Sequence, residues 1–318
     1  MGNYAFGVDV GGTNIVTGLI TRNGELKWKT KVPTEPEKGN ERVVQTIAAT
    51  IRQGLEETGI SKDELVGAGI GMPGLIDTEK GISIKATNLH FHHYPLADKL
   101  TALTNLPTVL NNDVRMYIYG EAVHGAGKNN DYVLGVTLGT GMAAAFVTKG
   151  ELFVGGGGLA GEMGHIPVDG VDYACNCGLT GCLETVVSAT GIARQAKEAV
   201  HAGKETILAT YYDDPDQITA ADVSKAYDAG DEVAVSIMNR TGELLGRAFS
   251  YVVPLLSPDV IIIGGGAALA GERLLASVRE SLMKNILPDY SERLKVKTAE
   301  HIDDAGIIGS ASWAFKHS

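Results

Sequence analysis

The chain has 318 residues, of which 44% are hydrophobic and 20% are charged, and this balance excludes intrinsic disorder as its main state. Its formal net charge of −11, without a basic stripe, argues against a nucleic-acid partner. Glycine is enriched, with 41 residues and no collagen-like period. We therefore expect the excess in tight turns and ligand-binding loops.

The chain opens with a predicted meander of three strands. Residues 4–10 read as the first strand, and a glycine turn follows it. Residues 15–21 are rich in β-branched side chains, which favours a second strand over a helix. Asn23-Gly24 is a strong turn pair, so we expect a third strand over residues 25–32.

Helices and buried strands follow the meander. Val43, Ile47 and Ile51 recur at helical spacing, which predicts a helix over residues 41–58. The next predicted elements, in chain order, are a strand over 65–70, a helix over 96–103, a strand over 107–110 and a helix over 114–124.

A second unit is expected to begin near residues 125–130. It opens as the first does, with a strand over 132–138, a glycine turn and a strand over 142–148. We expect an α/β protein of two domains, 1–124 and 125–303, with the first completed by a C-terminal helix at about 304–318. The remaining predicted elements are a glycine-rich region with the cysteines, helices over most of 190–255, a strand over 259–263, a helix to about residue 283, a strand over 295–298 and a helix from residue 305.

Two familiar nucleotide-binding motifs are missing or out of context. Gly127-Lys128 is followed by Asn129, so the sequence has no P-loop. Residues 69–74 match Gly-x-Gly-x-x-Gly after a predicted strand, but Pro73 lies inside the match and no helix is predicted directly after it. We therefore do not expect dinucleotide binding.

Three other glycine turns each end a predicted strand. Glycine lets the backbone approach a ligand and point N–H groups at phosphate oxygens. Asp9, just before the first turn, offers a carboxylate for Mg²⁺, directly or through water. The alternative is three ordinary tight turns, and their repeated position at strand ends favours phosphate binding. The turns are Gly11-Gly12-Thr13, followed by Asn14, then Gly139-Thr140-Gly141 and Gly264-Gly265-Gly266.

The most specific metal pattern is His-x9-Cys-x-Cys-x4-Cys, formed by His165, Cys175, Cys177 and Cys182. Three thiolates and one imidazole make a closed tetrahedral Zn²⁺ site without an open position, which indicates a structural ion rather than a catalytic one. The alternative is a loop with unligated thiols.

The same cysteines indicate the cellular compartment in which the protein resides. Three clustered cysteines fit a metal site in a reducing environment better than a disulfide framework. The residues before Asp9 show no signal-peptide pattern, and no apolar run reaches the roughly 18 residues of a membrane span. We therefore expect a cytoplasmic protein without a membrane partner.

Two polar clusters keep alternatives open. Asn112-Asp113 ends a predicted strand and precedes a helix, where a carboxylate serves as a general base or as a helix N-cap, and position alone favours the cap. His90, His92 and His93 are either metal ligands or side chains of a solvated loop, and the loop is favoured.

Together these motifs resemble the ROK family of bacterial sugar kinases and related repressors, over essentially the whole chain. The resemblance implies an actin-like, ribonuclease-H-like ATPase fold of two α/β domains with a cleft between them. It also implies a homodimer and the phosphorylation of a hexose by ATP and Mg²⁺, usually at O6. The motifs that carry it are Asp9-Val10-Gly11-Gly12-Thr13, Asn112-Asp113, Leu138-Gly139-Thr140-Gly141, Gly161-Glu162-Met163-Gly164-His165, the cysteine block through Glu184 and Gly264-Gly265-Gly266.

The resemblance also implies roles and alternatives. Asp113 matches the catalytic base of the family. Glucose is the expected sugar, with allose, N-acetylmannosamine, mannose or fructose as alternatives, because Ala143–Ala145 and Arg115 depart from the usual pattern. A sugar-sensing repressor is the alternative from another class, but the first glycine turn begins too early for a preceding DNA-binding motif. The positions that match sugar contacts are Asn88, Asn112, Glu162, His165 and Glu184, so that His165 would serve both zinc and sugar.

Overall fold

The computed structural model describes residues 2–318, which form two compact units. The first unit runs up to Asn129 and is completed by Glu300–Ser318, and the second unit is Asn130–Ala299. The borders lie a few residues from those expected at 124/125 and 303/304. The reason is Glu121, whose carboxylate accepts hydrogen bonds from the N–H groups of Ala126 and Glu300, so that both connecting segments stay attached to the first unit.

The first unit contains a five-stranded sheet in the order β3-β2-β1-β4-β8. β1 (Tyr4–Val10), β2 (Asn14–Thr21) and β3 (Leu26–Pro33) form the predicted antiparallel meander. β4 (Leu65–Met72) and β8 (Thr108–Asn112) extend the sheet in parallel with β1. The carboxyl ends of β1, β4 and β8 therefore meet at one edge of the sheet, where ligands bind in open α/β sheets.

The sheet of the second unit repeats this plan. Its order is β11-β10-β9-β12-β13, with an antiparallel meander followed by two parallel strands. Both units thus open with a strand, a glycine turn and a returning strand, as the sequence predicts. The strands are β9 (Tyr132–Leu138), β10 (Met142–Thr148), β11 (Glu151–Phe153), β12 (Val260–Gly264) and β13 (Lys295–Thr298).

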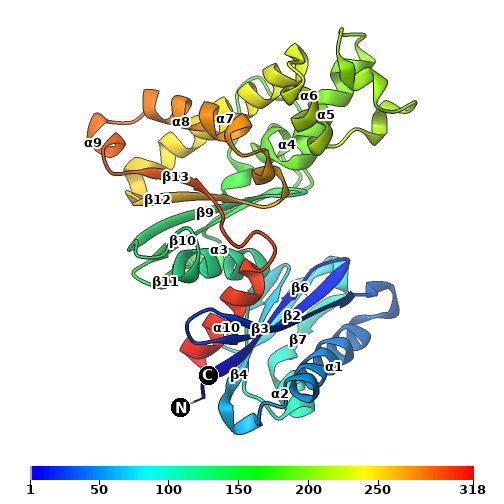
Figure 1. Cartoon of the computed structure of the whole chain (residues 1–318), viewed down its shortest axis with the longest axis vertical. Coiled ribbons are helices and arrows are strands. Elements are labelled where there is room, and N and C mark those ends of the chain that lie inside the picture. The colour runs from blue at the N-terminus through cyan, green and yellow to red at the C-terminus, as the bar shows by residue number, and fades with distance from the viewer. Residues whose placement is uncertain (1) are drawn as a thin grey trace. The chain divides into compact units, whose positions relative to one another are not determined.

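Helices cover both faces of the first sheet (Figure 1). α1 (Asn40–Thr58) and α2 (Leu96–Thr104) bury their apolar side chains against one face. α3 (Asp113–His124) and α10 (Ala305–His317) pack together at the other face. Glycine permits this close approach, because a Cβ at Gly69 of β4 would lie 1.8 Å from the carbonyl oxygen of Ser310 in α10.

The helices of the second unit gather on one side of its sheet in Figure 1 and share one apolar core with β9, β10 and β12. The longest helix described, α7, packs along α8. The helices are α4 (Glu184–Val187), α5 (Ala189–His201), α6 (Ala220–Asp228), α7 (Glu232–Leu256), α8 (Glu272–Lys284) and α9 (Pro288–Ser291).

A small antiparallel sheet of the first unit was not expected from the sequence. It consists of β5 (Leu75–Asp77), β6 (Ile82–Ala86) and β7 (Phe91–Tyr94). The placement of His92 and His93 on a loop is therefore wrong, because both lie in β7, although both side chains are exposed as expected. These strands are too short to show an alternating apolar pattern.

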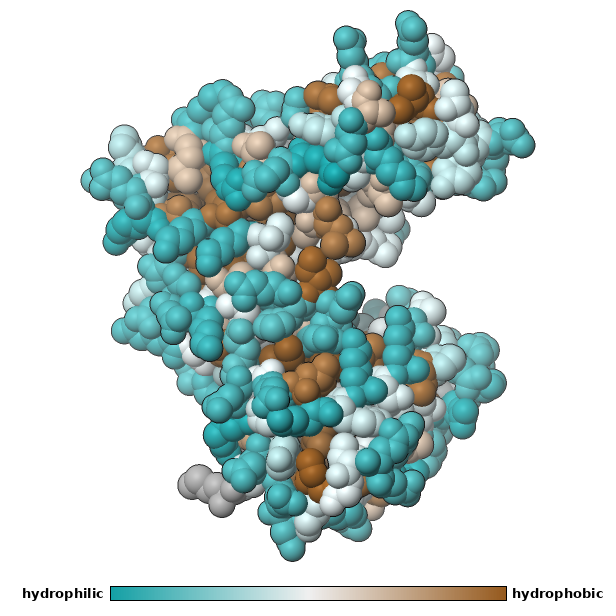
Figure 2. Space-filling view, in the orientation of Figure 1, coloured by the Kyte–Doolittle hydropathy of each residue, from teal (hydrophilic) through white to brown (hydrophobic). Residues whose placement is uncertain are grey.

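Polar side chains dominate the face drawn in Figure 2, and apolar residues show between them singly or in small groups. Among residues 2–318, no helix combines the length and the apolar character that a bilayer span requires.

Candidate functional site

The predicted site residues fall into two groups, one in each unit. The group in the first unit is Asp9, Gly11, Gly12, Thr13, Asn14, Asn88, Asn112 and Asp113. The group in the second unit is Gly139, Thr140, Gly141, Glu162, His165, Cys175, Cys177, Cys182, Glu184, Gly264, Gly265 and Gly266.

Two carboxylates of the first group share the carboxyl edge of the sheet. Asp9 of β1 pairs in register with Gly71 of β4, and a Cβ at Gly71 would lie 3.3 Å from the Cα of Asp113. Burial raises the pKa of Asp9 to about 7, and the negative charge of Asp113 contributes to the rise. Burial also raises the pKa of Asp113. The pair is therefore suited to accept a proton or to bind a cation.

Its position in the sequence favoured Asp113 as the N-cap of α3, and this prediction is wrong. Asn112 is the cap, and its side-chain oxygen accepts a hydrogen bond from the N–H of Arg115 at 3.2 Å. Asp113 is the first residue of α3, and one of its carboxylate oxygens accepts from the N–H of Val114 at 2.9 Å. Asp113 as a general base remains a prediction.

Asn88 lies on the short 3-10 helix Thr87–Leu89 and lines a cavity of about 390 Å³ together with Gly74 and Lys85. The side-chain amide of Asn112 donates to the carbonyl oxygen of Gly74 at 3.2 Å. The cavity wall is thus bonded directly to the residue before Asp113. This arrangement places a hollow with amide groups beside the predicted base.

The first glycine turn is fixed at its base and open at its tip. The N–H of Gly11 donates to the carbonyl oxygen of Asn14 at 2.9 Å, and the hydroxyl of Thr34 donates to the carbonyl oxygen of Gly11 at 2.7 Å. Gly12 and Thr13 are exposed, and no atom of the described chain lies within 4 Å of a Cβ built at Gly12. A ligand can therefore contact this backbone directly.

The structure brings the two glycine turns of the second unit together. β9 and β12 run parallel, with Thr137 opposite Gly264, so both turns lie at the same edge. Gly265 has a φ of +80°, and a Cβ there would lie 2.7 Å from backbone atoms of Leu138. Thr140 and Gly266 are the exposed residues of these turns. Two adjacent turns offer more N–H groups to a phosphate chain than one turn does.

The four predicted zinc ligands meet in one place, with their ligand atoms within 4.8 Å of one another. The sulfur atoms of Cys177 and Cys182 are 3.6 Å apart, and the sulfur of Cys175 is 3.7 Å from Nδ1 of His165. Ligands at 2.3 Å from a tetrahedral ion lie about 3.8 Å from each other. The four side chains thus fit Zn²⁺, with Nδ1 as the histidine ligand atom.

Two predicted sugar contacts flank this Cys/His cluster. The carboxylate of Glu162 lies 3.6 Å from Nε2 of His165, and that of Glu184 lies 3.7 Å from its Nδ1. The imidazole therefore turns one nitrogen to the predicted metal site and the other towards an exposed carboxylate. Such partners fix the direction of a ligating histidine ring.

The structure adds a residue that sequence reasoning missed. A Cβ at Gly306, in the first turn of α10, would lie 2.8 Å from a carboxylate oxygen of Asp9. The sequence gives no local signal for this contact, because β1 and α10 come from opposite ends of the chain.

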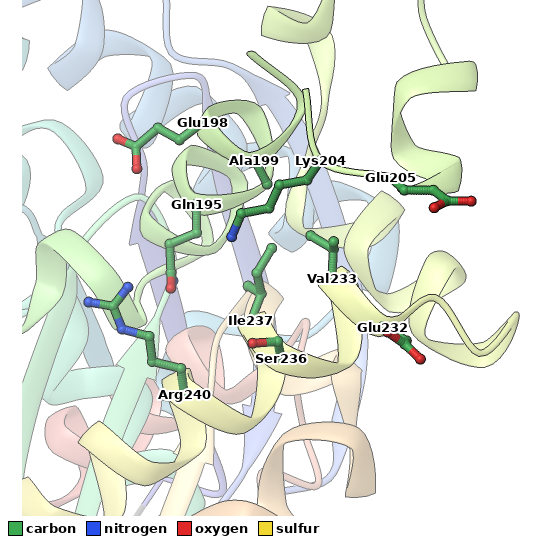
Figure 3. A pocket seen from close by; sticks show the side chains of 10 residues that line it. All are labelled: Gln195, Glu198, Ala199, Lys204, Glu205, Glu232, Val233, Ser236, Ile237 and Arg240. Carbon is green, nitrogen blue, oxygen red and sulfur yellow. The ribbon is translucent and has the colours of Figure 1, made fainter. Parts of the chain in front are cut away.

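A separate cavity of about 540 Å³ lies beside α5 and α7 (Figure 3). Lys204 extends into it in this view, and Gln195 and Arg240 line the same side. The described residues that line this cavity include none of the predicted site residues.

Comparisons with known proteins agree on one family. The profile of the ROK family matches residues 5–317. The chain is 40% identical to the glucokinase of Halalkalibacterium halodurans, over 98% of this chain and 94% of that protein. It is 36% identical to the glucokinase of Thermotoga maritima, over 96% of this chain and 95% of that protein. A solved structure is also similar, namely the crystal structure of a ROK family glucokinase from Streptomyces griseus in complex with glucose and AMPPNP. It superposes with a TM-score of 0.82 at 31% sequence identity, over 98% of this chain and 99% of that chain.

Proposed function

The chain belongs to the ROK family, and we therefore propose that it is an ATP-dependent hexose kinase that phosphorylates glucose at O6. Its two-domain, actin-like α/β fold is the one expected from the sequence. The observation that carries the proposal is the carboxylate pair of Asp9 and Asp113 beside the cavity of Asn88, in a chain that resembles glucokinases over nearly its full length.

Asp113 acts as the general base in this proposal. It accepts the proton of the sugar hydroxyl while the hydroxyl oxygen forms a bond to the terminal phosphorus of ATP, and the bond from that phosphorus to the leaving oxygen breaks to release ADP. Burial raises the pKa of Asp113 and so makes its carboxylate a stronger base than an exposed aspartate.

Asp9 and the glycine turns serve the nucleotide. Asp9 is suited to hold Mg²⁺, directly or through water, because a divalent cation offsets both its burial and the repulsion from Asp113. Mg²⁺ supplies charge neutralisation on the phosphates. The turns at Gly11–Asn14, Gly139–Gly141 and Gly264–Gly266 offer backbone N–H groups to the phosphates and the rest of the nucleotide.

Amide, carboxylate and imidazole groups recognise the sugar. These side chains accept or share several hydrogen bonds, as sugar hydroxyls require. Zn²⁺ at the Cys/His cluster is structural and orients His165. The proposed contacts are Asn88, Asn112, Glu162, His165 and Glu184. We also propose a cytoplasmic homodimer.

A coupled assay of ADP release across a panel of hexoses tests the proposal. We expect turnover with glucose and ATP that requires Mg²⁺. Turnover with allose, N-acetylmannosamine, mannose or fructose instead would reassign the sugar and keep the reaction. Sugar binding without ADP release from any hexose would contradict a kinase and favour a sugar-sensing regulator.

A further inference from the structure

We propose that Glu184 is a positioning residue that links the Cys/His cluster to the Gly139–Gly141 turn, so that the metal state of the cluster sets the affinity of the turn for nucleotide. The inference rests on the proposed function, because it takes this turn to be part of the nucleotide site. It adds a role that a sugar contact at Glu184 alone does not include.

The two carboxylate oxygens of Glu184 bind different parts of the second unit. Oε2 accepts a hydrogen bond from the N–H of Met142, the first residue after the turn, at 3.1 Å. Oε1 accepts a hydrogen bond from the thiol of Cys175 at 2.9 Å and lies 3.7 Å from Nδ1 of His165. The Glu184 side chain is only 19% exposed, so water competes little for these contacts. One carboxylate therefore bridges two predicted metal ligands and the turn.

The turn is built to receive this carboxylate. A Cβ at Gly141 would lie 2.5 Å from Oε2 of Glu184, so a side chain at this position would displace the carboxylate. The start of α5 holds the rest of the turn. The N–H of Ala189 donates to the carbonyl oxygen of Gly139 at 2.9 Å, and the hydroxyl of Thr190 donates to the carbonyl oxygen of Thr140 at 2.6 Å. Of these three attachments, the one through Glu184 also contacts the cluster.

Ordering of the cluster makes the link sensitive to metal. A divalent cation bound by the four ligands would hold the Cys175 and His165 side chains, both of which contact Oε1 of Glu184, in one fixed arrangement. Without the cation, these side chains are no longer fixed by a common centre. The position of Glu184, and with it the direction of the Met142 N–H and the shape of the turn, then becomes less defined.

Glu162 provides a matched control, because its carboxylate also contacts His165. It lies 3.6 Å from Nε2, on the other side of the ring from Glu184, and its side chain is 64% exposed. Both carboxylates are proposed sugar contacts. If Glu184 serves only the sugar, the two truncations should act alike, weakening glucose binding and leaving nucleotide binding unchanged.

The experiment is calorimetric titration of the full chain with Mg²⁺-AMPPNP in the absence of sugar. Zinc content and thermal unfolding are measured on the same samples. We expect Glu184→Ala to raise the AMPPNP Kd about tenfold, the size of one lost hydrogen bond to a charged group. Glu184→Gln keeps an acceptor for the Met142 N–H and should recover most of the affinity. Glu162→Ala should leave the Kd within twofold.

Wild-type protein stripped of zinc with 1,10-phenanthroline, and still folded by circular dichroism, should show the same rise in AMPPNP Kd. If Glu184→Ala does not fold, the Glu184→Gln and stripped samples decide the question. An unchanged Kd in folded Glu184→Ala, or in folded stripped protein, would overturn the inference alone. Wild-type protein that does not bind AMPPNP would overturn the proposed function, and this inference with it.

Discussion

Asp9 and Asp113 show how the first unit sets the chemistry of single side chains. Both carboxylates lie at the carboxyl edge of β1, β4 and β8, and burial raises the pKa of each. Asn112 takes the capping role at α3 and so leaves Asp113 to serve another function. The two aspartates therefore have different expected effects on activity and stability.

Replacement of Asp113 should slow the chemical step without disrupting the fold. We expect Asp113→Asn to lower kcat by about 10²–10⁴-fold, the range for a positioned acid–base group. The glucose KM should change little, because the amide keeps the shape of the side chain. Coupled ADP-release kinetics measure both constants. Asp98→Asn, on the exposed face of α2, is the matched control, and near-normal turnover of Asp113→Asn would place the base elsewhere.

Replacement of Asp9 should stabilise the protein in the absence of ligands while abolishing activity. Burial and repulsion from Asp113 raise the pKa of Asp9 from 3.8 to about 7. In the wild-type protein, protonated Asp9 therefore stabilises the folded state relative to ionised Asp9. This contribution is fully present below about pH 3.8 and is lost as the pH rises through about 7, because the folded state then holds a buried charge.

At pH 8 we therefore expect Asp9→Asn to raise the midpoint of thermal unfolding by several degrees and to remove part of its pH dependence between pH 4 and 7. Scanning calorimetry without Mg²⁺ or nucleotide measures both effects. Asp289→Asn, an exposed aspartate of α9, should leave the midpoint unchanged. A lower midpoint for Asp9→Asn would show that its carboxylate stabilises the fold.

At the scale of elements, we expect the cysteine loop to depend on metal, because residues 176–180 around Cys177 are exposed and no core packing holds them. We expect the purified chain to hold about one Zn²⁺. Cys177→Ala should lose most of it and lower the midpoint of thermal unfolding, since the cluster orders the segment from His165 to Cys182. Metal analysis and calorimetry test this. Leu179→Ala, an exposed neighbour, should keep the metal, and fully active wild-type protein without zinc would contradict the prediction.

α10 and β4 pack so closely that only glycine fits between them. We expect Gly69→Ala to destabilise the first unit by about 2 kcal/mol or more, because its Cβ would lie 1.8 Å from the backbone oxygen of Ser310. Gly156→Ala, at an exposed position with no described atom within 4 Å of a Cβ, is the control. Equal unfolding midpoints for the two variants would show that α10 can shift at little cost.

Local patterns predict elements well where the pattern is long. β1, β9 and β10 begin and end at the predicted residues, since these seven-residue meander strands carry both apolar content and turn signals. β5, β6 and β7 were missed because segments of three to five residues carry too little pattern. The adjacency of the Gly139 and Gly264 turns was also beyond prediction, because it depends on the register of β12 against β9.

The Cys/His cluster was the most predictable part of the candidate site. Its ligands lie close in sequence, so spacing alone brings them within reach of one ion. The contacts of the carboxylates could not be predicted from spacing in this way. Glu184 bonds Met142, and Asp9 contacts Gly306, across long stretches of chain that only tertiary packing brings together.

At the scale of the whole molecule, the two units repeat one strand order. In each unit a glycine turn joins the first two strands of the meander. The same local arrangement, a glycine turn between two antiparallel strands, thus occurs twice in one chain. The units differ in what surrounds the turn, since the first has the aspartate pair and the second has the Cys/His cluster.

The assembly state gives a further prediction. We expect a homodimer with about twice the chain mass of 33.4 kDa at micromolar concentration. Sedimentation velocity over a tenfold concentration range measures it. A single species at the monomer mass throughout that range would contradict the prediction.

The placement of α10 has a consequence for biosynthesis. Residues 130–299 form a unit of their own, whereas β1 gains its partner α10 from residues 305–317. A chain emerging from the ribosome at about 5–20 residues per second therefore exposes its complete second unit roughly one to four seconds before α10 is available to the first unit. We expect the environment of Asp9 to form late in synthesis, because its contact with Gly306 requires α10.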